Sequence, residues 1–82
     1  MQSIDFIRAL LVELKGCHLP EFQEELRSLD VIEDLGLDSL DVFSYIFQIE
    51  EAYNIKITEP HVDEKGLMKI GNMVTYIDQA LN

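Results

Sequence analysis

The sequence predicts a small all-α protein, a four-helix bundle of three longer helices and one short helix, in a single domain over residues 1–82. Its length of 82 residues allows one domain with a thin core. Apolar residues recur at intervals of three and four over two long segments, and a third long segment is apolar over most of its length. The alternation of apolar and polar residues that is typical of strands is confined to residues 54–58.

The first predicted helix covers residues 4–14. One face of it carries apolar side chains at helical spacing, namely Ile4, Ile7, Leu10, Leu11 and Leu14. Ser3 is placed to cap its start. Gly16 is placed to end it, because glycine readily adopts the left-handed conformation that closes a helix.

The chain between His18 and Asp38 contains Pro20 and shows no sustained hydrophobic period, which predicts a long loop. Apolar side chains are expected to anchor it to the core: Leu26, Leu29, Val31, Ile32 and Leu35. Because so long a connection is uncommon in a small domain, we expect a short helix within it, near residues 21–26.

The second long helix is predicted over residues 39–53, where no Gly or Pro interrupts the chain and Asp38 or Ser39 can cap the first turn. A helical wheel places one stripe inward: Val42, Ile46, Ile49 and Tyr53. It places on another side Leu40, Phe43, Phe47, Glu50 and Glu51. Phe43 and Phe47 are therefore expected to face solvent.

After Pro60 the sequence predicts a short turn or helix near residues 62–67, followed by a last amphipathic helix. The apolar positions of this helix are Met68, Ile70, Met73, Val74, Ile77 and Leu81, and Gly71 favours a start after that residue. We expect six apolar residues to surround any interior cleft: Leu10, Ile46, Ile49, Met68, Met73 and Ile77.

Charge and composition exclude several classes of function. The formal net charge is −10, which repels nucleic acid and favours basic proteins as partners. Apolar runs are too short for a membrane span. Cys17 has no second cysteine, so no internal disulfide is expected. The first residues lack the pattern of a secretory signal, and we expect a cytoplasmic protein.

The segment from Asp34 to Asp41 carries the chemistry, because a glycine-containing loop delivers Ser39 to the first turn of a helix. A phosphate ester on Ser39 would lie close to the free amides and the positive end of the helix dipole. Taken alone, Ser39 is more often a helix cap. A serine hydrolase is disfavoured because neither His18 nor His61 has the spacing of a catalytic partner. An EF-hand is excluded because valines occupy ligand positions.

The motif Asp34-Leu-Gly-Leu-Asp-Ser-Leu-Asp, followed by a helix ending in Ile49-Glu-Glu-Ala-Tyr53 and by Ile55-Lys-Ile57, resembles the acyl carrier protein family. The resemblance covers the whole chain and implies a four-helix bundle. It implies that Ser39 receives 4′-phosphopantetheine from coenzyme A through a phosphopantetheinyl transferase, and that the arm carries cargo as a thioester. It also implies that Asp38 assists the modification by transiently holding Mg²⁺, with no resident metal, and that the protein is not an enzyme.

The same resemblance implies that the helix headed by Ser39 docks onto partner enzymes. No Lys or Arg lies between Arg27 and Lys56, so this stretch is acidic and suits acyl-activating, condensing or acyl-transfer enzymes with basic patches. The docking residues are expected to be Leu40, Asp41, Phe43, Phe47, Glu50 and Glu51. The protein is expected to be a monomer.

Departures from the family pattern favour a specialised carrier. Ser44 stands where familiar fatty-acid carriers bear glutamate, and the region from Pro60 to Met73 is slightly longer. A specialised fatty-acid or polyketide-type pathway is the main interpretation. The alternatives are a peptidyl or aminoacyl carrier, and an unmodified helical adaptor that binds proteins through Phe43 and Phe47; a hydrolase using Ser39 ranks last.

Overall fold

The computed structural model describes residues 3–16 and 18–81. Over these ranges the chain forms helices α1 (Ser3–Lys15), α2 (Gln23–Arg27), α3 (Ser39–Tyr53), α4 (Glu59–Lys65) and α5 (Ile70–Leu81). No strand occurs among them, and one isolated antiparallel bridge pairs Asp30 with Lys69. The all-α class is confirmed, with two short helices where short helical segments were expected. The expectations about Cys17 and the first two residues lie outside the described residues.

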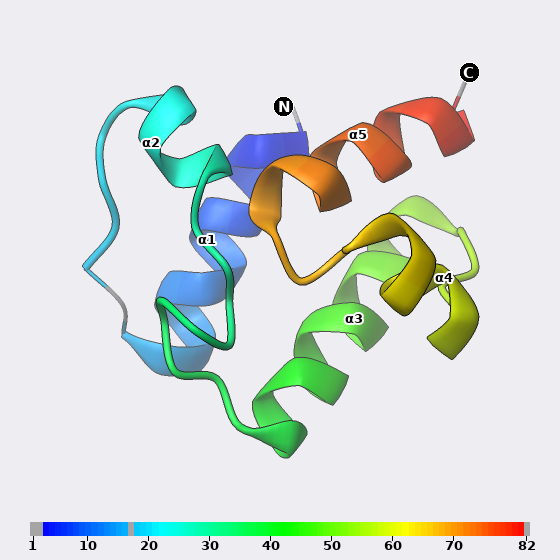
Figure 1. Ribbon diagram of the computed structural model, residues 1–82, viewed down its shortest axis with the longest axis horizontal. Helices are drawn as coiled ribbons and strands as arrows, with labels where there is room; N and C mark the ends of the chain where they lie inside the picture. Colours follow the sequence, from blue (N-terminus) through cyan, green and yellow to red (C-terminus); the bar gives the residue numbers. More distant parts are fainter. Residues whose placement is uncertain (1–2, 17, 82) are drawn as a thin grey trace.

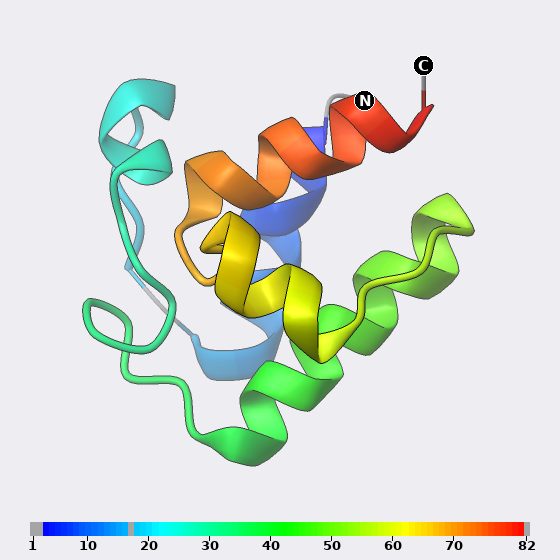
Figure 2. The ribbon, with the colours of Figure 1, turned by 45° about the vertical axis from the view of Figure 1, so that its right-hand side comes forward.

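The three long helices form the body of the bundle. Helix α1 packs against both α3 and α5, and α2 packs against α5. Figures 1 and 2 show α4 between α5 above and α3 below, and they show the loop from α2 descending to the start of α3. In both views the start of α3 lies at the opposite end of the molecule from the start of α1 and the end of α5. The segment that carries Ser39 is therefore at one extremity of the bundle.

The core lies where the apolar stripes of the long helices meet. Helix α1 contributes buried Ile4, Ile7, Leu10 and Leu11, and its predicted stripe is confirmed with Leu14 half-buried. Helix α5 contributes buried Ile70, Met73, Val74 and Ile77, and helix α3 contributes Tyr45 and Ile49. Burial of these side chains is the main favourable term that holds the helices together.

Both ends of α1 were assigned from sequence, and one assignment is wrong. Gly16 has a φ of +65° and its amide donates to the Val12 carbonyl at 2.8 Å, which confirms it as the terminating residue. Ser3 was expected to cap the helix from outside. It instead lies within α1, and its hydroxyl donates to the Asp78 carboxylate at 3.1 Å. Ser3 therefore ties α1 to α5.

Helix α5 begins before Gly71, at Ile70, contrary to the sequence expectation. A Cβ atom at Gly71 would lie 3.0 Å from the Arg27 carbonyl oxygen and 3.2 Å from the Arg27 Cβ. The glycine is thus explained by close approach of α2 to the first turn of α5. It marks a contact between helices, not a helix boundary.

The loop between α2 and α3 is anchored as predicted, with one exception. Of the predicted anchors, Leu26 and Val31 are buried, and Leu29 and Leu35 are half-buried against the core. Leu37, which was not among the predicted anchors, is also buried. Two backbone hydrogen bonds of 2.9 Å, from Val31 to Met68 and from Ile70 to Leu29, join this loop to the start of α5. Ile32 was expected to anchor the loop but is 46% exposed.

Candidate functional site

In the loop that precedes α3, aspartate side chains accept hydrogen bonds from backbone amides of the same loop. The Asp30 side chain accepts hydrogen bonds from the amides of Ile32 and Glu33 at 2.8 and 2.9 Å, and the Asp34 side chain accepts one from the Asp30 amide at 2.7 Å. Gly36 then adopts a φ of +73°, where a side chain would be strained. These contacts fix the path of the chain into α3.

Asp38, and not Ser39, caps helix α3. Its backbone is extended and its Oδ1 accepts a hydrogen bond from the Asp41 amide at 2.9 Å. Ser39 is the first residue of the 15-residue helix, and its side chain is exposed. The serine hydroxyl thus lies at the positive end of the helix dipole and is accessible from solvent, an arrangement that favours a covalently held phosphate.

An exposed apolar face follows Ser39 along α3. Leu40 is 76%, Phe43 66% and Phe47 60% exposed, which confirms that the two phenylalanines face solvent. On the opposite side of the helix, Ile49 is fully buried, and the other members of the predicted inward stripe, Val42, Ile46 and Tyr53, are half-buried. Large apolar side chains exposed together in this way mark interaction surfaces.

Acidic groups on α3 differ in how they are engaged. Lys15, from the end of α1, lies 3.6 Å from the Asp41 carboxylate, and so a cation reaches a stretch that has none in sequence. The Glu50 carboxylate accepts a hydrogen bond from the Ile57 amide at 2.8 Å, which ties α3 to the segment leading to α4. Glu51 is exposed, so it is the acidic group of this helix that is best placed for a partner.

Comparison with known proteins identifies the family. The phosphopantetheine attachment site family matches residues 5–77. The chain is 38% identical to an acyl carrier protein of Campylobacter jejuni strain RM1221, over 95% of each chain. It is 35% identical to one of Wolinella succinogenes, over 95% of this chain and 96% of the relative, and 36% identical to one of Chlamydia caviae, over 94% of each.

The chain belongs to the acyl carrier protein family. It is accordingly a carrier and not a catalyst, and its cofactor is covalently bound 4′-phosphopantetheine. An exposed hydroxyl at the start of a long helix fits a phosphodiester of this kind, since the free amides and dipole of the first turn stabilise negative charge. None of the described helices is long and apolar enough to cross a membrane.

Tyr45 is a buried residue of α3 that the sequence analysis did not place in the core. The helical wheel put it outside the inward stripe, yet it is fully buried, and its hydroxyl has no hydrogen-bond partner among the described residues. Burial raises the pKa of the phenol, with a smaller contribution from the negative charge of Asp30. The signal that was available is its spacing of four residues from Ile49, which places both on one helix face.

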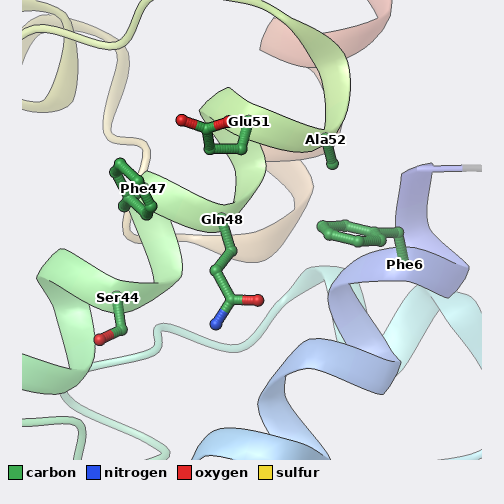
Figure 3. A pocket seen from close by; sticks show the side chains of 6 residues that line it. All are labelled: Phe6, Ser44, Phe47, Gln48, Glu51 and Ala52. Carbon is green, nitrogen blue, oxygen red and sulfur yellow. The ribbon is translucent and has the colours of Figure 1, made fainter.

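Two grooves flank the apolar face of α3. One, between α1 and α3, has a volume of about 770 Å³ and is lined by Phe6, Ser44, Phe47, Gln48, Glu51 and Ala52. Figure 3 shows Phe6 rising from α1 and Gln48 reaching from α3 into the space between the two helices. The edge of Phe6 also meets the ring of Tyr53 in a T-shaped contact, with centroids 5.5 Å apart.

The second groove lies between α3 and α4 and has a volume of about 350 Å³. Of the six residues expected around an interior cleft, Ile46 lines this groove. Leu10, Ile49, Met73 and Ile77 are buried in the core, and Met68 is half-buried against it. Methionines in such positions fill irregular space between helices.

Proposed function

We propose that Ser39 is the residue to which the 4′-phosphopantetheine arm is attached, and that the protein presents an acyl group held as a thioester on this arm to partner enzymes. The observation that carries the proposal is the exposed serine at the first position of a long helix, within the Asp-Ser-Leu motif of a chain that belongs to the carrier family. The thioester and its flexible tether supply the chemistry, while the helix bundle supplies position and recognition.

Asp38 is proposed to assist the modification of Ser39. Its Oδ1 already accepts the amide of Asp41, but a carboxylate has two oxygens with several acceptor sites. Asp38 can therefore cap α3 and at the same time contribute to a Mg²⁺ site while the transferase works, because Mg²⁺ is commonly held by one or two carboxylates together with phosphate oxygens. No resident metal is part of this proposal.

Mass spectrometry tests the attachment site. The carrier, incubated with coenzyme A, Mg²⁺ and a promiscuous phosphopantetheinyl transferase, is expected to gain the mass of one arm. Ser39→Ala is expected to abolish the gain. Ser44→Ala, a serine on the same helix, is the matched control and is expected to load like the parent protein. An unchanged mass for the parent protein would favour the unmodified adaptor, and loading of Ser39→Ala would place the arm elsewhere.

The docking surface is proposed to comprise Leu40, Asp41, Phe43, Phe47, Glu50 and Glu51. Exposed aromatic side chains at its centre and carboxylates at its edge match the usual anatomy of a protein interface, in which apolar anchors carry affinity and charges steer the encounter. Partner enzymes are the transferase and acyl-activating, condensing or acyl-transfer enzymes with basic patches. The carrier is proposed to act as a monomer.

Paired substitutions separate docking from general effects. Phe47→Ala is expected to lower the rate of loading at subsaturating carrier concentration by roughly tenfold, as truncation of an interface anchor does. Phe22→Ala removes a phenylalanine that is 70% exposed immediately before α2, and it is expected to leave the rate unchanged. A second pair of variants tests the role of charge. Glu51→Lys on α3 and Glu24→Lys on α2 change the net charge equally. Slower association with the transferase for Glu51→Lys alone would support docking along α3. Equal effects would contradict it.

A specialised fatty-acid or polyketide-type pathway in the cytoplasm is the proposed setting. Ser44 supports it: this residue replaces the glutamate expected at its position, and it lies beside Phe47 on the groove between α1 and α3. The loss of one acidic group at the docking face favours partners with a less basic contact at that point. Parallel loading assays with acyl-activating and adenylating enzymes distinguish an acyl carrier from the alternative, a peptidyl or aminoacyl carrier.

A further inference from the structure

We propose that a third groove, beside Ser39 itself and lined mainly by apolar side chains, holds the geminal dimethyl segment of the phosphopantetheine arm when the arm is not engaged by a partner. We call it the loop groove; it is lined by Ile32, Leu37, Asp38, Ser39, Val42 and Phe43. The inference rests on the proposed attachment at Ser39. It adds a resting position for the arm on this carrier.

The loop groove lies between the loop that precedes α3 and the first turns of α3. Its volume is about 370 Å³, within the range of roughly 300–1,000 Å³ typical of small-molecule sites. Leu37 is buried at its base, and its amide donates to the Val31 carbonyl at 3.0 Å. Ile32 and Phe43 also line it, and both side chains are exposed.

The chemistry of the arm matches this lining. The phosphodiester stays at the Ser39 oxygen, where the first turn of α3 stabilises its negative charge. The next part of the arm, a few bonds further, is a carbon bearing two methyl groups, and it is the most apolar part of the chain between phosphate and thiol. The Asp38 carboxylate repels the phosphodiester, so the methyl groups and not the phosphate suit the groove between Ile32 and Phe43.

The covalent tether makes even weak contact sufficient. Because Ser39 lines the loop groove, an arm on its oxygen begins at the rim, and a short flexible tether gives an effective concentration on the order of millimolar. The groove between α3 and α4 contains no atom of Ser39 among its lining residues, so the start of the arm has no comparable access to it. A resting arm that covers Ile32 and Phe43 also reduces the apolar surface exposed to water.

Nuclear Overhauser effects in the loaded carrier test the proposal. The protein is converted to the holo form, with loading verified by intact mass, and contacts are measured from the arm's geminal methyl protons. We expect cross-peaks to the Ile32 side chain and the Phe43 ring, and chemical-shift changes for both relative to the apo form. Ile32→Ser is expected to remove the cross-peaks to position 32 and to weaken those to Phe43.

Val12→Ser is the matched control, since Val12 is 49% and Ile32 46% exposed, and it is expected to leave the arm's cross-peaks unchanged. A fully loaded carrier whose geminal methyl groups show no contact to Ile32 or Phe43, or contact only residues of the α3–α4 groove such as Ile57 and Val62, would overturn the inference and leave attachment at Ser39 intact. Failure to gain the mass of the arm would overturn both.

Discussion

Asp38 combines an observed role as a helix cap with a proposed role in the modification of Ser39. One carboxylate oxygen accepts the Asp41 amide and so starts helix α3, and the same side chain stands next to the serine proposed to be modified. Because the cap requires only an acceptor oxygen whereas metal binding favours a negative charge, substitutions can separate the two roles.

We predict that Asp38→Ala lowers the free energy of unfolding by about 1 kcal/mol, the usual cost of losing a helix cap. Asp38→Asn keeps an acceptor at the cap position and is expected to retain most of the stability while loading more slowly. Urea unfolding measures the first effect and the loading rate measures the second. Equal loading by the Asn variant and the parent protein would rule out a role for the charge.

The buried hydroxyl of Tyr45 is a local cost in the core. It has no partner among the described residues, and a buried polar group without a hydrogen bond destabilises the folded state. We predict that Tyr45→Phe raises the free energy of unfolding by about 1 kcal/mol, because the ring is retained and the unpaired hydroxyl is removed. Chemical denaturation near neutral pH checks this. A clearly less stable Phe variant would show that the hydroxyl is satisfied.

The same hydroxyl makes stability depend on alkaline pH. Burial raises the pKa of Tyr45 above its unfolded value of 10.0, so between these two values the folded state binds more protons than the unfolded state. The titration of Tyr45 therefore leaves the free energy of unfolding unchanged below pH 10 and lowers it progressively as the pH rises above that value. Tyr45→Phe is expected to lessen the alkaline loss of stability. Part of the loss should remain, because burial also raises the pKa of Tyr53.

Individual contacts were the least predictable features of the site. Ser39, its exposure and the cap next to it follow from local sequence, since a cap, an uninterrupted helix and a glycine turn are all encoded within a few residues. The Lys15–Asp41 pair and the bond from Ile57 to Glu50 join elements that are separate in sequence. They depend on how α1 and the segment after α3 pack, so no local pattern reveals them.

Among the helices, α3 was predicted with its observed limits, whereas α4 and α5 were shifted. The start of α3 is marked by a capping side chain, and Asn54, in the left-handed conformation, ends it. Helix α4 begins at Glu59 because Pro60 suits a first helical turn, and so it begins earlier than the apolar pattern indicated. The sequence suggested a helix boundary at Gly71. The actual reason for the glycine is its close contact with Arg27, which is distant in sequence and so leaves no local pattern.

Helix α4 is the least firmly packed of the described helices. None of its residues is fully buried, and a side chain from α5 helps to hold it. The Tyr76 hydroxyl donates to the Lys56 carbonyl at 2.8 Å and lies 3.1 Å from Nδ1 of His61. Since the hydroxyl has one hydrogen, its oxygen accepts from the imidazole, which assigns a proton to Nδ1.

We predict that Tyr76→Phe selectively loosens α4. Loss of the two contacts is expected to speed amide hydrogen exchange in residues 59–65 several-fold, with little change in α1, because weakly packed elements open locally. Tyr53→Phe keeps its ring against Phe6 and serves as the control, with unchanged exchange in α4 expected. Uniform acceleration across all helices in Tyr76→Phe would instead indicate a contribution to global stability.

At the scale of the whole molecule, the net charge of −10 is the dominant electrostatic feature. Like charges on so small a surface repel one another and destabilise the compact state. We predict that the melting temperature near neutral pH rises by several degrees between low and physiological salt, as screening shortens the Debye length to about 8 Å. Millimolar Mg²⁺ should act in the same direction. A melting temperature insensitive to both would contradict this account.

We propose that the same charge steers the carrier toward partner enzymes with basic patches. Figures 1 and 2 place the start of α3, which Ser39 heads, at one end of the molecule, and the loop leading to it carries the exposed acidic residues Glu33, Asp34 and Asp38. Steering by charge mainly accelerates encounter, which suits a carrier that must bind and leave several enzymes in turn.

The most direct test of this account is the mass of the protein isolated from its own cells, with tandem fragmentation of the peptide that contains residues 34–45. The account predicts a peptide heavier by one 4′-phosphopantetheine, with the modification localised to Ser39. A protein that stays unmodified in cells with an active transferase, or an arm localised to Ser44, would contradict it.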